Sequence, residues 1–93
     1  MDKKLEEVVE RAMRVIEKEL EDPSSFNKNT HDSLSRVTGL SAFLNVKSAE
    51  AKMLGNKEDA AYLASIVKSL NEIVSDLKYK IKSAQLGIYN TNG

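Results

Sequence analysis

The feature that most constrains this chain is a long stretch, residues 57–86, in which apolar side chains recur with a seven-residue spacing. The spacing is marked by Leu63, Leu70, Leu77 and Ala84, and the same face is filled by Ile66, Val67, Ile73, Val74 and Ile81. This pattern predicts an amphipathic helix that packs against other helices. At 1.5 Å per residue the predicted helix is about 45 Å long, more than one small domain needs to cover its core. The stretch therefore predicts a helical bundle and suggests a partner.

A first, shorter helix is predicted over residues 3–21. Its apolar stripe follows three- and four-residue steps and consists of Leu5, Val8, Val9, Ala12, Met13, Ile16 and Leu20. Glu7 lies four residues before Arg11, which predicts an ion pair on the exposed side of the helix. Pro23 ends this helix because proline disfavours helical geometry in the residue before it. Residues 22–30 are predicted to form a polar connector.

A second helix is predicted over residues 31–54, with Asn29 or Thr30 as its N-terminal cap. Its apolar side is predicted to comprise Leu34, Val37, Leu40, Phe43, Leu44, Val46 and Leu54. Small residues, among them Ser48, become frequent toward its end, so a neighbouring backbone is expected to approach closely there. Gly39 is unfavourable in a helix interior, which indicates a close-contact point or a slight kink.

The pair Gly55-Asn56 predicts a tight connection between the second and third helices, with glycine closing one and asparagine capping the next. So short a connection produces an antiparallel hairpin. The third helix is expected to end at Gly87 and to leave residues 87–93 as a flexible tail. The predicted fold class is all-α: a single domain, residues 1–93, in which a long antiparallel hairpin carries one shorter N-terminal amphipathic helix. Both a three-helix bundle and an oligomeric helical hairpin satisfy this pattern.

Composition excludes several classes of function. The chain has no cysteine, which rules out disulfides, thiolate nucleophiles and cysteine-based metal sites. It has no apolar run long enough to cross a membrane. The formal net charge is zero, distributed as −3 over residues 1–22, +2 over residues 23–55 and +1 over residues 56–93. This distribution favours packing of the acidic first helix on the other two, and nucleic acid would have to bind a local patch. We expect a cytoplasmic protein, or a virus-encoded one inside its host cell.

No residue cluster carries recognisable chemistry. His31 is the only histidine and is followed by Asp32 and Ser33, but consecutive residues on a helix point about 100° apart and cannot form a catalytic triad. A lone histidine without a second ligand at helical spacing does not predict a metal site. We therefore expect no enzyme and no cofactor.

The third helix supplies the candidate sites. Its apolar seam is interpreted as an oligomer interface formed by Leu63, Ile66, Leu70, Ile73, Leu77 and Ile81. The alternative is that the other two helices cover this seam within one chain. Lys78, Lys80 and Lys82 form the densest basic stretch, and each is a candidate for contact with nucleic-acid phosphate. These lysines would equally complement the negative C-terminal end of a helix.

In architecture, a helical hairpin with one extra amphipathic helix is similar to the oligomerisation cores of small phage DNA-packaging subunits and to small helical immunity or adaptor proteins. The first similarity implies a non-enzymatic assembly protein that binds copies of itself and nucleic acid. The second implies a monomeric inhibitor, immunity or adaptor protein with one protein partner. For that alternative the candidate anchors are Phe26, Ile88 and Tyr89.

Overall fold

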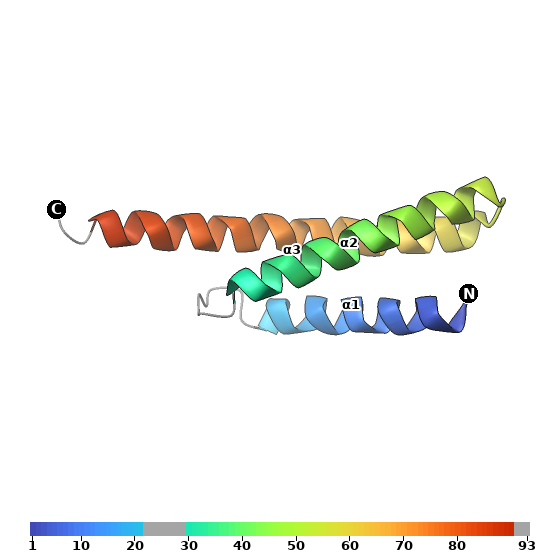
Figure 1. Ribbon diagram of the computed structural model, residues 1–93, viewed down its shortest axis with the longest axis horizontal. Helices are drawn as coiled ribbons and strands as arrows, with labels where there is room; N and C mark the ends of the chain where they lie inside the picture. The colour runs from blue at the N-terminus through green and yellow to red at the C-terminus, as the bar shows by residue number, and fades with distance from the viewer. Residues whose placement is uncertain (22–29, 91–93) are drawn as a thin grey trace.

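The structure, a computed structural model, describes residues 1–21 and 30–90 of the 93-residue chain. These residues form three helices, α1 (Lys3–Glu21), α2 (Thr30–Met53) and α3 (Lys57–Asn90), and no strand (Figure 1). The predicted all-α class is therefore confirmed. Phe26 and Pro23 lie outside the described residues.

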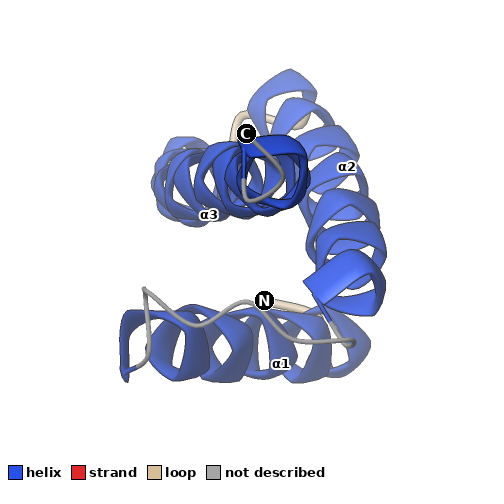
Figure 2. Ribbon diagram, turned by 90° about the vertical axis from the view of Figure 1, so that its left-hand side faces the viewer, coloured by secondary structure: helices blue, strands red, loops and turns tan. Residues whose placement is uncertain are grey.

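The helices alternate in direction, so that α1 and α3 run one way and α2 runs the opposite way (Figure 1). The molecule measures 58 × 19 × 16 Å. Viewed nearly along its length, α2 lies to one side of both other helices, and α1 lies below α3 (Figure 2). The N-terminus lies toward the end at which α2 and α3 join, and α3 ends at the opposite end of the molecule (Figure 1).

The connection between α2 and α3 forms as the glycine predicts. Gly55 adopts φ +83°, a left-handed conformation that strains any residue with a Cβ. The Asn56 N–H donates to the Ala51 carbonyl at 2.9 Å and the Gly55 N–H to the Lys52 carbonyl at 3.1 Å. These are the two bonds of a Schellman motif, which satisfies carbonyls that the helix end would leave unpaired. The Asn56 carbonyl then accepts the Ala60 N–H at 3.0 Å and starts α3.

The far end of α3 differs from the prediction. The helix continues through Gly87 to Asn90, so the predicted tail at residues 87–93 is wrong for residues 87–90. A glycine costs a helix interior about 1 kcal/mol but stops it only when the next residues build a left-handed cap. No such cap forms at Gly87, and Gly55 is the glycine with positive φ in the described part of the chain.

Two serine hydroxyls fix how α2 lies on α3. The buried Ser41 donates to Asn71 Oδ1 at 2.6 Å, and Ser48 donates to the backbone carbonyl of Ala60 at 2.8 Å. Because a serine side chain is short, the second bond requires the α3 backbone to lie close to α2 near the hairpin. The close approach predicted from the small residues of α2 is thereby confirmed.

The predicted apolar side of α2 is covered only in part. Val37 and Leu44 are fully buried, whereas Phe43 is 43% exposed and Val46 is 55% exposed. The reason is that apolar residues are spread around most of the circumference of α2 and one neighbouring helix covers only one side. Gly39 is not a close-contact point, since a Cβ built on it would meet nothing within 4 Å.

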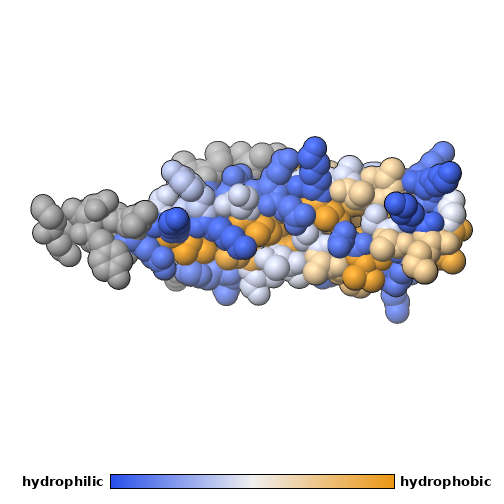
Figure 3. Space-filling view, turned by 90° about the horizontal axis from the view of Figure 1, so that it is seen from above, coloured by the Kyte–Doolittle hydropathy of each residue, from blue (hydrophilic) through white to orange (hydrophobic). Residues whose placement is uncertain are grey.

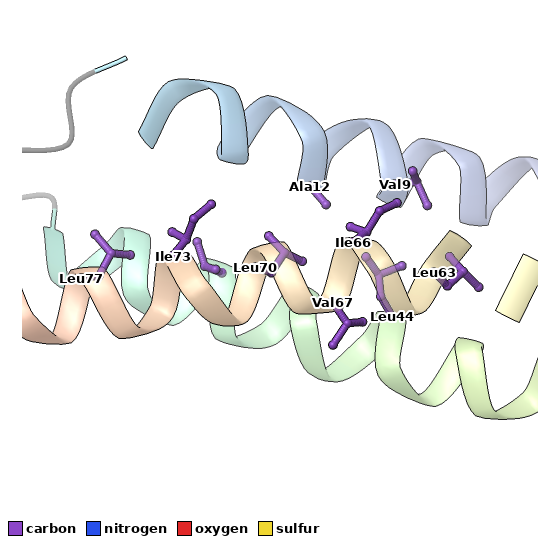
Figure 4. Close-up of a cluster of buried hydrophobic side chains, with 10 residues drawn as sticks. Val9, Ala12, Leu44, Leu63, Ile66, Val67, Leu70, Ile73 and Leu77 are labelled. Carbon is purple, nitrogen blue, oxygen red and sulfur yellow. The ribbon is translucent and has the colours of Figure 1, made fainter. Parts of the chain in front are cut away.

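The hydrophobic core lies where all three helices meet, and α3 contributes most of it (Figure 4). Its members are Val9 and Ala12 from α1, Val37 and Leu44 from α2, and Leu63, Ile66, Val67, Leu70, Ile73 and Leu77 from α3. The three leucines at seven-residue spacing, Leu63, Leu70 and Leu77, are at most 2% exposed. The seven-residue repeat therefore marks the axis of the core.

Gly55 and Gly39 should respond in opposite ways to the same substitution. Gly55→Ala should lower the free energy of unfolding by about 1 kcal/mol because alanine is strained at positive φ. Gly39→Ala should raise it by up to about 1 kcal/mol because the position is helical and has room for a methyl group. Urea denaturation followed by circular dichroism measures both, and changes of equal sign would contradict this account of the hairpin.

Candidate interaction surfaces

The seam predicted as an oligomer interface lies in the interior of the single chain. Its exposed fractions are 0% for Leu63 and Leu70, 4% for Ile66, 6% for Ile73 and 2% for Leu77. Figure 4 shows Val9 and Ala12 of α1 directed toward this seam from one side, and Leu44 of α2 beside it. In this structure helices of the same chain cover these five residues. Ile81 is the member that stays partly exposed.

The last turns of α3 run past the described ends of both other helices (Figure 1). With 34 residues against 24 in α2 and 19 in α1, α3 exceeds what either neighbour can cover. Ile81 and Ala84 continue the core seam into this projecting end and are only partly buried. Residues 81–90 are called the projecting end below.

The three candidate lysines do not share one environment. Lys80 Nζ lies 3.7 Å from Glu19 Oε2 of α1, and its side chain is only 11% exposed. Lys78 and Lys82 are exposed and lie one turn apart on α3. The structure therefore brings Lys78 and Lys82 together as an exposed pair and uses Lys80 to hold α1 on α3. Here the acidic character of α1 meets the basic stretch of α3, as the charge distribution predicts.

A groove of about 580 Å³ lies between α1 and α2, and the sequence analysis did not predict it. Its lining is mostly apolar and carries two arginines: Val8, Arg11 and Val15 come from α1, and Ser35, Arg36, Gly39, Leu40 and Phe43 from α2. The sequence feature that could have predicted it is the large number of apolar residues on α2, since one neighbouring helix cannot bury all of them. We call this surface the α1/α2 groove.

Apolar side chains are also exposed where α2 and α3 join. Met53 is 87% exposed and Leu54 is 78% exposed. In the view from above, apolar surface at this end is interrupted by strongly hydrophilic residues (Figure 3). Two tyrosines of α3 are exposed as well, Tyr62 at 48% and Tyr79 at 73%. These side chains are scattered and do not line one groove.

The described residues hold no group of three histidine, cysteine, aspartate or glutamate side chains that could bind a metal ion. His31 is exposed in the first turn of α2. None of the helices in the described part of the chain has the length and apolar character needed to cross a membrane. Of the candidate partner anchors, Phe26 lies outside the described residues, and Ile88 and Tyr89 belong to the projecting end.

Comparison of the chain with protein-family models, with curated proteins and with solved structures gives no match in any of the three. We therefore infer its function from the surfaces described above.

The ion pair between Lys80 and Glu19 should stabilise the docking of α1. Lys80→Ala should lower the free energy of unfolding by about 1 kcal/mol, because both partners are largely shielded from water. Lys78→Ala and Lys82→Ala, at exposed positions, should change it by less than about 0.5 kcal/mol. A double-mutant cycle with Glu19→Ala measures the coupling directly, and additive effects would show that the pair contributes nothing.

Proposed function

We propose that the protein is a non-enzymatic helical assembly protein that self-associates through the projecting end of α3. The observation that carries the proposal is the continuation of the core seam, through Ile81 and Ala84, past the described ends of α1 and α2. Inside the bundle this seam is covered by helices of the same chain. In the projecting end it offers a partly exposed apolar strip on which the same segment of a second copy can pack.

The expected association is weak. A pairing of two projecting ends spans about 10 residues, or roughly 15 Å of helix. Stable interfaces bury about 1,200–2,000 Å² in total, and a contact of this length buries less. We therefore expect dimers or larger rings at micromolar or higher concentrations of the chain, and monomers below them.

Nucleic acid is the partner that we propose for the assembled form. Lys78 and Lys82 are exposed at the base of the projecting end, and an assembly repeats this pair in every copy. Each phosphate that a lysine neutralises adds to an affinity that falls with salt. A small subunit of this kind would suit a phage-type DNA-packaging complex or another nucleic-acid-associated assembly.

Self-association should depend on Ile81 and not on its neighbour Tyr79. Ile81→Glu places a charge in the proposed contact and should leave a folded monomer at all concentrations. Tyr79→Glu introduces the same charge at a position that is 73% exposed, and should leave the concentration dependence as in the wild type. Size-exclusion chromatography with light scattering, from low to high micromolar concentration, measures the mass of each variant.

Leu70→Glu provides the third comparison for this experiment. Leu70 is fully buried in the chain, so a charge there should unfold the protein and not merely dissociate it. Circular dichroism separates these two outcomes. A wild-type chain that remains a monomer at high micromolar concentration would refute the proposed self-association.

Binding of double-stranded DNA should require Lys78 and Lys82. The double change Lys78→Glu with Lys82→Glu should abolish binding measured by fluorescence anisotropy. The control pair, Lys57→Glu with Lys68→Glu, changes two exposed lysines elsewhere on α3 and should weaken binding far less. In the wild type the logarithm of affinity should fall with the logarithm of salt concentration by about 0.9 for each phosphate contacted. Binding that ignores salt, or survives the first pair of changes, would contradict the proposal.

A further inference from the structure

The α1/α2 groove combines a mostly apolar lining with open space. Val8, Val15 and Leu40 are only partly buried, and Phe43 at the groove is 43% exposed. Gly39 widens the groove, because a Cβ built on it would meet nothing within 4 Å. Two antiparallel helices with apolar residues along their shared edge form the kind of groove into which a third amphipathic helix packs.

The charged residues of the groove are of one sign. Arg11 on α1 and Arg36 on α2 line it, and neither is ion-paired in the described part of the chain. The helical pair predicted between Glu7 and Arg11 does not form. Beyond Phe43, Lys47 lies with its Nζ 5.6 Å from the centre of the ring and is itself paired with Glu50 at 3.2 Å.

We propose that the α1/α2 groove binds an amphipathic helix of another protein that carries carboxylates beside its apolar stripe. The apolar stripe packs on Val8, Val15, Leu40 and Phe43, and the carboxylates meet Arg11 and Arg36. Arginine suits this role because its planar guanidinium binds a carboxylate through two parallel hydrogen bonds. This inference does not depend on the proposed self-association, because the groove and the projecting end have no residue in common.

A second copy of the chain is a poorer occupant. The acidic helix of a second copy, α1, already directs its buried residues Val9 and Ala12 into its own core. The projecting end of a second copy contains Lys82 and is preceded by Lys78, and Arg11 and Arg36 would repel both lysines. Charge complementarity therefore favours an acidic helix from a different protein.

The test uses two synthetic peptides of about 17 residues, long enough to cross the groove as a helix. Both carry leucines at three- and four-residue steps. One has glutamates on both sides of the leucines and the other has lysines at the same positions. Titration of each into the isotope-labelled chain, followed by NMR, gives an affinity and the residues that respond. The glutamate peptide should bind about tenfold more tightly than the lysine peptide and should shift signals of residues in the groove.

Three variants sharpen the result. Gly39→Leu should fill the groove without disturbing the fold and should abolish binding of the glutamate peptide. Arg11→Glu with Arg36→Glu should lower the affinity for the glutamate peptide about tenfold and raise the affinity for the lysine peptide. Arg14→Glu changes an exposed arginine of α1 that does not line the groove and should have little effect on either peptide.

Several outcomes would overturn the inference. Equal affinity for the two peptides would show that the arginines do not contribute to binding. Binding that persists in a folded Gly39→Leu variant would show that the peptide binds outside the groove. Self-association that Gly39→Leu abolishes and Ile81→Glu leaves intact would make a second copy the occupant. A different measurement tests the proposed self-association. It is the mass of the Ile81→Glu variant, which does not depend on either peptide.

Discussion

Contact between α2 and α3 along the line of Leu63, Leu70 and Leu77 is what the rest of the molecule depends on. Six of the ten residues of the core cluster come from α3, and the other two helices contribute two each. Neither α1 nor α2 is expected to be stable alone, because most of the stability of a helix in a protein comes from packing of its apolar face. The Gly55 turn sets the direction of α2 along α3, and the bonds from Ser41 and Ser48 set how closely the two lie. Helix α1 packs on a face of the core that this hairpin leaves uncovered.

The shallow docking of α1 follows from its own apolar stripe. Val9 and Ala12 are the residues of α1 that the core encloses, whereas Leu5, Val8, Val15 and Ile16 are covered only in part. The ion pair from Glu19 to Lys80 adds a second attachment near the far end of the helix. An apolar stripe wider than the surface that covers it produces the α1/α2 groove, so the groove is a consequence of how the core is divided among three helices.

Much of this fold can be predicted from the sequence, but the use of its surfaces cannot. The repeat of Leu63, Leu70 and Leu77 predicts the long helix, and Gly55-Asn56 predicts the hairpin, because each depends on local geometry. The same repeat does not distinguish a core from an oligomer interface, since a helix packs in the same way on its own chain and on another. The exposed side of α2 could not be predicted either, because its apolar residues lie around most of the helix. The end of α3 at Asn90 could not be predicted from Gly87 either, since glycine ends a helix only when a left-handed cap follows.

The distribution of charge affects how the projecting end and the α1/α2 groove would bind their partners. The chain has no net charge, so it has no long-range field to draw a partner in, and association should proceed at ordinary rates. Both surfaces are nevertheless locally basic, through Lys78 and Lys82 at one and Arg11 and Arg36 at the other. They differ in what accompanies the charge. At the groove apolar residues accompany the arginines, so salt should reduce the affinity of a helix without removing it. The two lysines are exposed, and binding of a polyanion there should disappear once salt screens the charges.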